Sequence, residues 1–226
     1  MKVEEVRARI EEIGIVPAIR VTSTEEARFS ADAVTRGGIP IVEITMTVPG
    51  ACELIRDMVS HAPDMIVGAG TVLDPETAHH CLEAGAHFIT SPGLDLSIVQ
   101  LAKKAKVLTM PGALTPSEIT AALRAEVDFI KVFPCAQMGG ASYIRALKGP
   151  FVNAPLIAAG GVTQQTASDL IRAGAIALGI GSELIPREAI RRRRAEQIVE
   201  LARRFLGIVN EARKWAPPAK ELVARG

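Results

Sequence analysis

Eight short, mainly apolar segments recur along this chain of 226 residues. They span residues 15–21, 39–46, 65–72, 87–92, 107–114, 128–134, 155–161 and 177–184. The mean step between their starts is about 23 residues, which fits one strand, one helix and two short loops. Most of their residues are apolar in continuous runs, as is usual for parallel strands covered on both faces. The spacing therefore predicts a strand–helix unit repeated eight times.

Helix start and stop signals lie between these segments. Capping residues stand before acids or proline at Ser23, Asp74 and Thr115. Glycines at positions 37, 38, 85 and 174 are placed to end helices just before the next strand. Before the first of these segments, four apolar residues fall at helical spacing: Val3, Val6, Ile10 and Ile13. They predict an additional helix over residues 1–13.

Eight such units in about 210 residues predict a compact (β/α)8 TIM barrel with little room for insertions. An open, doubly wound sheet is the competing architecture, but residues 15–24 lack the GxGxxG motif that would favour it. No linker or change in composition divides the chain, so we expect one domain over residues 1–226. The helical periodicity fades after Ala212, which predicts a loosely docked C-terminal extension from about residue 213.

Composition excludes several classes of protein. The hydrophobic share of 48% supports a large core, and the net charge of +1 gives no field to attract nucleic acid or an anionic membrane. Arg191 to Arg194 are expected on a solvated helix rather than on a nucleic-acid surface. The three cysteines are widely spaced and favour neither a disulfide framework nor a zinc site, so no metal is expected. No apolar run approaches the length of a membrane span, and we expect a soluble, cytoplasmic protein.

Lys131 stands out because it lies inside an apolar segment, whereas the other seven lysines lie in helical, loop or terminal segments. Burial would favour the neutral amine, lowering the pKa, and a neutral amine is the nucleophile needed for Schiff-base chemistry on a carbonyl. The alternative is a structural lysine that pairs with an interior acid or reaches the rim of the barrel.

Glu43 is the one carboxylate in the middle of an apolar segment. If residues 129, 131 and 133 face the barrel interior, and residues 41, 43 and 45 do the same, Glu43 approaches Lys131. A carboxylate there could move protons to and from a carbinolamine and an enamine. The alternative is a plain buried ion pair.

Two glycine-bearing segments, residues 159–163 and 179–183, follow the last two predicted strands. Loops at these positions recurrently bind phosphate in the barrel fold, because glycine lets backbone N–H groups approach an anion. Each segment alone could simply reverse the chain. Together they predict a phosphate site.

Several motifs resemble the 2-dehydro-3-deoxy-phosphogluconate (KDPG) and 4-hydroxy-2-oxoglutarate (KHG) aldolase family. The resemblance runs from about Ile10 to Leu206 and rests on VEIT at 42–45, VGAGTV at 67–72, FITSPG at 88–93, MPGALTPSE at 110–118, FIKVFP at 129–134 and GIGS at 179–182. It implies a metal-independent class I aldolase that needs no cofactor and is typically a homotrimer.

Carried over to this sequence, the resemblance implies roles for individual residues. Lys131 would form the Schiff base with pyruvate or the 2-keto acid, and Glu43 would shuttle protons. Thr71 would help to hold the pyruvate carboxylate, and Pro92 and Phe133 would form pocket walls. The phosphate loops would contain Gly160, Gly161, Gly181 and Ser182.

Two positions depart from the family pattern. Thr47 stands where many members have an arginine that binds the substrate anion, and we expect Arg20, at the end of the first strand, to replace it. Ala159 stands where the family often has threonine before the glycine pair, which affects the stereoselectivity for the sugar.

The function implied is cleavage of 2-dehydro-3-deoxy-6-phosphogluconate to pyruvate and glyceraldehyde 3-phosphate, a reaction of carbohydrate metabolism in the Entner–Doudoroff pathway. Cleavage of 4-hydroxy-2-oxoglutarate to pyruvate and glyoxylate would be a second activity. The alternatives are an aldolase for the galactonate epimer, a phosphate-binding barrel isomerase or synthase, and a non-catalytic oligomeric scaffold.

Overall fold

The structure, a computed structural model, describes residues 1–215, and all eight predicted segments contain strands. The strands are β1 (Ile15–Ile19), β2 (Ile41–Thr45), β3 (Ile66–Gly70), β4 (Phe88–Thr90), β5 (Leu108–Met110), β6 (Gly112–Ala113), β7 (Ile130–Val132), β8 (Leu156–Ala159) and β9 (Ala177–Ile180). All neighbouring strands are parallel, in the order β5-β4-β3-β2-β1-β9-β8-β7-β6. The predicted (β/α)8 barrel is confirmed.

Pro111 closes the barrel. The sheet begins with β5 and ends with β6, and only Pro111 separates these two strands in the chain. Proline has no N–H to donate to a neighbouring strand, so the segment predicted as one strand is interrupted there. Its carbonyl still accepts a hydrogen bond from the backbone N–H of Lys131 at 2.9 Å. Nine strands therefore occupy eight positions in the barrel.

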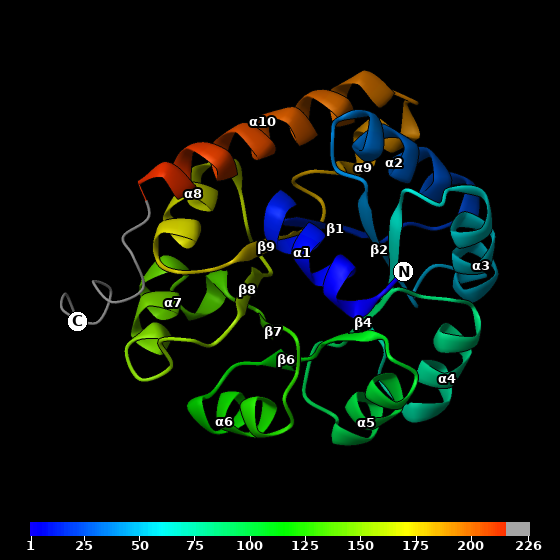
Figure 1. Ribbon diagram of the computed structural model, residues 1–226. Helices are drawn as coiled ribbons and strands as arrows, with labels where there is room; N and C mark the ends of the chain where they lie inside the picture. The colour runs from blue at the N-terminus through cyan, green and yellow to red at the C-terminus, as the bar shows by residue number, and fades with distance from the viewer. Residues whose placement is uncertain (216–226) are drawn as a thin grey trace.

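Helices surround the strands (Figure 1). They are α1 (Val3–Ile13), α2 (Thr24–Arg36), α3 (Ala51–His61), α4 (Pro75–Glu83), α5 (Leu96–Lys104), α6 (Pro116–Arg124), α7 (Ala141–Lys148), α8 (Gln164–Arg172), α9 (Arg187–Arg191) and α10 (Ala195–Lys214), with a 3-10 turn η1 (Ala136–Met138). The predicted N-terminal helix, α1, lies across one end of the ring in Figure 1. The Arg7 guanidinium of α1 lies 5.5 Å from the centre of the Phe129 ring. The first helix therefore covers the end of the barrel where the strands begin.

The predicted helix caps are present. The side chains of Ser23, Asp74 and Thr115 each accept a hydrogen bond from a backbone N–H in the first helical turn. Gly85 and Gly174 follow the ends of α4 and α8 with φ values of 85° and 105°, which glycine adopts without strain. Local sequence signals therefore set where these helices begin and end.

Arg191 to Arg194 were predicted to lie on one helix, and this prediction is wrong. Helix α9 ends at Arg191, and the other three arginines form the turn before α10. Arg192 forms a local ion pair with Glu188, four residues earlier, and Arg193 forms a tertiary ion pair with Glu25. The sequence pattern of residues 191–194 does not distinguish a turn from a helix.

Helix α10 packs on α2 and α8 and extends past Ala212 to Lys214. Arg213 donates hydrogen bonds to the carbonyl oxygens of Glu11, Glu12 and Ile176, which ties the end of α10 to α1. Residues 213 and 214 therefore belong to α10, and residues 216–226 of the predicted extension lie outside the described part of the chain.

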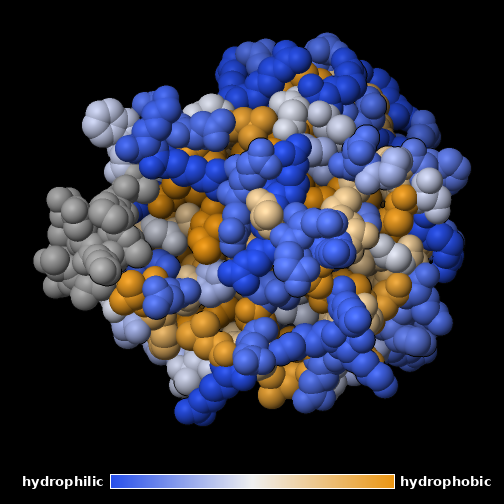
Figure 2. Space-filling model, viewed as in Figure 1, coloured by the Kyte–Doolittle hydropathy of each residue, from blue (hydrophilic) through white to orange (hydrophobic). Residues whose placement is uncertain are grey.

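The outer helices are amphipathic. In Figure 2 hydrophilic side chains cover much of the visible surface, with hydrophobic side chains showing between them. Alanine, valine, leucine and isoleucine make up most of the buried core between the strands and the helices. No helix within residues 1–215 is long and apolar enough to cross a membrane.

Candidate active site

Lys131 and Glu43 meet inside the barrel. Lys131 lies on β7 and Glu43 on β2, and the distance from Lys131 Nζ to Glu43 Oε2 is 3.5 Å. The two side chains are 13% and 5% exposed. The contact confirms the proximity predicted from strand alternation. An ion pair so nearly removed from water is costly unless further groups stabilise it.

Thr90 is such a group, and it was missed in the sequence. Its hydroxyl lies at the end of β4, fully buried, and accepts a hydrogen bond from Lys131 Nζ at 3.3 Å. Alternation along β4 predicts that Phe88 and Thr90 share one face but not which face points inward; in the structure it is this face, because the Phe88 ring lies against Gly68 in the interior. The Phe133 ring adds a contact on the other side, with its centre 5.7 Å from Lys131 Nζ.

Gly70 makes the space that the Glu43 carboxylate occupies. A Cβ atom built on Gly70 would lie 2.1 Å from Glu43 Oε1. No side chain other than hydrogen therefore fits at the end of β3 while Glu43 keeps this position. The glycine was part of a recognised motif, but its steric role follows only from the packing of β2 on β3.

Arg20 and Thr71 form a second polar group at the same end of the barrel. Arg20 Nη2 donates a hydrogen bond to Thr71 Oγ1 at 2.9 Å. Thr71 has a φ of 58°, which is strained for a β-branched residue and costs about 1–3 kcal/mol. Such strain is most often retained where it serves a site. The contact joins the residues that directly follow β1 and β3, which are 51 positions apart in the sequence.

A cavity of about 320 Å³ joins these groups to the glycine loops. Its lining includes the three candidate side chains Arg20, Glu43 and Lys131, the Phe133 ring, and all four predicted phosphate-loop residues, Gly160, Gly161, Gly181 and Ser182. Thr163 and Glu183, the last residues of the two predicted glycine-bearing segments, were not named as phosphate contacts and also line it. The sequence candidates are therefore brought together at the C-terminal ends of the strands, where barrel active sites form.

Backbone geometry explains the glycine pair. Gly160 and Gly161 have φ values of 85° and 78°, and a Cβ on Gly161 would lie 2.4 Å from Cβ of Ala136. Only glycine fits there. Directly after this pair, the Thr163 hydroxyl caps α8 by accepting from the N–H of Thr166. The positive end of a nine-residue helix thus begins beside the cavity.

Three predicted residues, Thr47, Thr71 and Pro92, do not line this cavity, although Thr71 is hydrogen-bonded to Arg20, which does. Thr47 is exposed, and its hydroxyl lies 2.7 Å from that of Thr45. It shares a neighbouring cavity with Arg20. Pro92 is half-buried, and its carbonyl faces the backbone of Gly112, where an added Cβ would lie 2.0 Å away.

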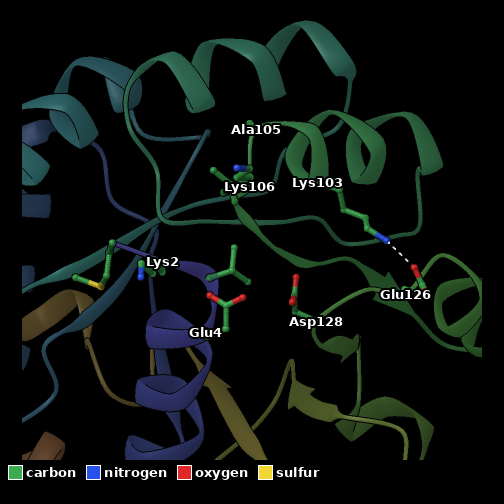
Figure 3. Close-up of a pocket in the computed structure, with 10 residues that line it drawn as sticks. Lys2, Glu4, Lys103, Ala105, Lys106, Glu126 and Asp128 are labelled. Carbon is green, nitrogen blue, oxygen red and sulfur yellow. Dashed lines mark hydrogen bonds and ion pairs between the residues drawn. The ribbon is translucent and has the colours of Figure 1, made fainter.

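A larger cavity, about 640 Å³, lies at the opposite end of the barrel between α1 and the segments before β5 and β7. Figure 3 shows its lysines, Lys2, Lys103 and Lys106, among the acids Glu4, Glu126 and Asp128. Lys103 pairs with Glu126 at 3.2 Å. This end of a barrel ordinarily serves stability, and the cavity is distant from the buried Lys131 and Glu43 pair. The smaller cavity is therefore the better candidate.

Lys148 is a second buried lysine, which the sequence did not single out. Its ammonium group donates to the carbonyl oxygens of Val152 and Ala154, at 2.7 and 3.0 Å. Burial lowers the pKa of Lys148 from its ordinary value. Lys148 does not line the cavity, and its contacts are those of a structural lysine.

Known proteins resemble this chain over most of its length. The family model for KDPG and KHG aldolase matches residues 6–201. The KHG/KDPG aldolase of Escherichia coli is 32% identical over 189 residues, which cover 84% of this chain and 89% of that protein. The 2-dehydro-3-deoxy-phosphogluconate aldolase of Pseudomonas aeruginosa is 30% identical, with coverage of 93% and 98%.

Solved structures agree. The KDPG aldolase of Legionella pneumophila, with pyruvate captured as a covalent carbinolamine intermediate, superposes with a TM-score of 0.81 at 29% identity. The matched region covers 87% of this chain and 96% of that one. A 3-hexulose-6-phosphate synthase of Salmonella typhimurium has a TM-score of 0.68 at 18% identity and covers 88% and 99% of the two chains, a likeness of fold alone.

The barrel, the site at its carboxyl end and these similarities define the protein as a carbon–carbon lyase of the pyruvate-dependent aldolase class. Within that class, the chain belongs to the KDPG and KHG aldolase family.

Proposed function

We propose that this enzyme is a class I aldolase that cleaves 2-dehydro-3-deoxy-6-phosphogluconate through a Schiff base on Lys131. The observation that carries the proposal is the contact of 3.5 Å between the Lys131 amine and the Glu43 carboxylate in a cavity that also contains the glycine loops. Cleavage of 4-hydroxy-2-oxoglutarate to pyruvate and glyoxylate is the second activity we propose.

Schiff-base formation begins at the Lys131 nitrogen. Glu43 is close enough to accept the ammonium proton, which frees the lone pair to attack the C2 ketone. The resulting carbinolamine oxygen takes a proton from the Glu43 carboxylic acid and leaves as water. The Thr90 hydroxyl, which accepts from Nζ, orients the amine for this attack. The product is an iminium ion between Lys131 and C2.

Carbon–carbon cleavage follows from the charge on the iminium. The Glu43 carboxylate, which the dehydration left ionised, removes the proton of the C4 hydroxyl, the C3–C4 bond breaks, and its electron pair forms the enamine as the iminium nitrogen is neutralised. Glyceraldehyde 3-phosphate is the aldehyde released. Glu43 then returns a proton to C3, and water hydrolyses the iminium to release pyruvate and the Lys131 amine. The iminium accepts the electrons, so the mechanism requires no metal ion or organic cofactor.

Substrate recognition uses the two ends of the cavity. Arg20, held by Thr71, offers a guanidinium to the C1 carboxylate. The backbone of Gly160, Gly161 and Gly181 and the Ser182 hydroxyl would hold the phosphate, with the amino end of α8 adding its dipole. Phe133 forms an apolar wall beside the amine. Thr47 and Pro92 remain proposed contacts for the bound substrate.

Borohydride reduction in the presence of pyruvate tests the Schiff base. We expect peptide mass mapping to find the reduced pyruvyl adduct on Lys131 and not on Lys148. Lys148 is the matched control because it is a buried lysine whose pKa burial lowers, while its amine lies outside the cavity. An adduct on Lys148, or none on Lys131, would overturn the mechanism.

The choice of sugar acid is tested by kinetics. The galactonate epimer is the competing substrate, because Ala159, buried beside the cavity, offers no hydroxyl to distinguish the two, and the structure titled "Native KDPGal structure" has a TM-score of 0.81 with this chain. We expect a higher kcat/KM for the gluconate form. A higher value for the galactonate form would reverse the assignment.

The assembly we propose is a homotrimer located in the cytoplasm. A designed protein cage made by fusing symmetric oligomeric domains matches this chain with a TM-score of 0.81 and 28% identity, which supports a symmetric assembly. Light scattering at micromolar concentration should give the mass of three chains, and a monomer mass would refute the trimer. Cell fractionation tests the location.

A further inference from the structure

Three sulfur atoms from separate segments meet outside the active-site cavity. Met46 directly follows β2, Cys52 lies on α3 and Cys81 lies on α4. The Met46 sulfur lies 3.4 Å from Cys81 Sγ and 4.0 Å from Cys52 Sγ. Burial and the neighbouring Cys52 thiol raise the pKa of Cys81. None of the three residues lines the cavity that contains Lys131.

The chemistry of this cluster is that of a soft-metal site. Thiolate and thioether sulfur together select Cu(I), whereas structural zinc takes four ligands in a tetrahedron. Within residues 1–215 no three His, Cys, Asp or Glu side chains are grouped to hold a metal ion, so a hard or borderline cation has no comparable site there. The thioether of Met46 is the ligand that completes the set of three.

The distances fit three-coordinate geometry. At a metal–sulfur distance of about 2.3 Å, three sulfur atoms in a trigonal plane are about 4.0 Å apart. The distance from the Met46 sulfur to Cys52 Sγ already has this value, and the distance to Cys81 Sγ would lengthen by about 0.6 Å to reach it. The backbone of Met46 is held by a hydrogen bond from its N–H to the Gly70 carbonyl at 2.8 Å. Cys81 is fully buried, while Met46 and Cys52 are half-buried and give an ion a way in from solvent.

We propose that Met46, Cys52 and Cys81 form a binding site for one Cu(I) ion. Both thiols lose a proton to solvent as the two Cu–S bonds form, and the Met46 thioether donates a lone pair without a change of charge. No oxidation or reduction takes place. With Cu(I) bound, the site carries one net negative charge, and water solvates this charge where Cys52 is partly exposed. The site does not depend on the proposed aldol reaction.

The test is a competition titration of the fully reduced, full-length protein under anaerobic conditions. The protein receives Cu(I) held by a chromogenic Cu(I) chelator, and the loss of chelator colour measures the metal transferred. We expect the unmodified protein to take up one equivalent. C52S and C81S should lose this uptake, and M46L should retain it with lower affinity because a two-coordinate dithiolate remains.

Cys135 gives the matched control. It is also buried, and its thiol lies 3.8 Å from the Gly140 carbonyl, away from the cluster. C135S should take up one equivalent like the unmodified protein. Aldolase activity and thermal melting of each variant show that it is folded. The proposal fails if the unmodified protein takes up no Cu(I), if folded C52S and C81S bind as it does, or if C135S loses the ion.

Discussion

Replacing Gly70 with alanine adds one methyl group at the point where the Glu43 carboxylate lies. The new Cβ would be 2.1 Å from Glu43 Oε1 and 2.4 Å from both Cδ and Cγ of the same side chain. Real Cβ contacts essentially never fall below 3.0 Å, so the carboxylate must retreat by about 0.9 Å. Gly70 itself is not among the residues that line the cavity. The substitution therefore displaces the carboxylate that we propose as the proton shuttle, while its chemistry stays the same.

The size of the effect follows from this displacement. A misplacement of about 1 Å costs a catalytic arrangement roughly 100-fold in rate. We expect G70A to lower kcat/KM by about 100-fold, equal to about 2.7 kcal/mol of transition-state stabilisation. Overpacking of the barrel interior should also lower the free energy of unfolding, by about 1–3 kcal/mol.

Gly68→Ala is the matched control, because it adds the same methyl group on the same strand. Its Cβ would meet the Phe88 ring at 2.2 Å rather than Glu43. Aldol cleavage is followed by coupled reduction of the aldehyde product, and stability by urea denaturation. G68A should lose stability like G70A and retain more activity. If both variants lose activity equally, or if G70A is fully active, the steric account of Glu43 is refuted.

Three further predictions concern other side chains. Arg20→Ala should raise the KM for pyruvate in the condensation direction by about 10-fold, since a charge-assisted contact is lost; an unchanged KM would contradict the assignment of Arg20. Lys148→Met should lower the free energy of unfolding by about 2 kcal/mol, because two buried carbonyl oxygens lose their donor, and should leave kcat unchanged. Hydrogen bonds from Thr115 and Leu114 hold the pKa of Glu118 below its usual value of 4.5, so their stabilisation is present above that pH and is lost as the pH falls through the folded-state pKa. In Glu118→Gln the free energy of unfolding, measured by urea titration, should therefore fall less between pH 5 and pH 3 than in the unmodified protein. An unaltered slope of the free energy of unfolding against pH would show that this carboxyl does not contribute.

The contact between Lys131 and Glu43 could be predicted from sequence because strand alternation is a local property. Alternation places Lys131 on the interior face of one strand and Glu43 on the interior face of another. Both side chains then point into the same narrow barrel interior, where they are in contact. Thr90 obeys the same rule but lies beside Ser91 in a short segment, where the sequence alone does not show which hydroxyl faces inward. The register between β4 and its neighbours decides it.

The regular spacing of apolar segments, the capping residues and the glycines after the last strands determined the architecture and the end of the barrel that carries the site. These are local signals, because hydrophobic periodicity and backbone conformation depend on neighbouring residues. Contacts between distant segments were decided only in the tertiary structure. They include the space that Gly70 leaves for Glu43, the bond from Arg20 to Thr71 and the meeting of Met46, Cys52 and Cys81. Each depends on how side chains from different strands and helices pack to a fraction of an ångström, and no pattern along the chain encodes that distance directly.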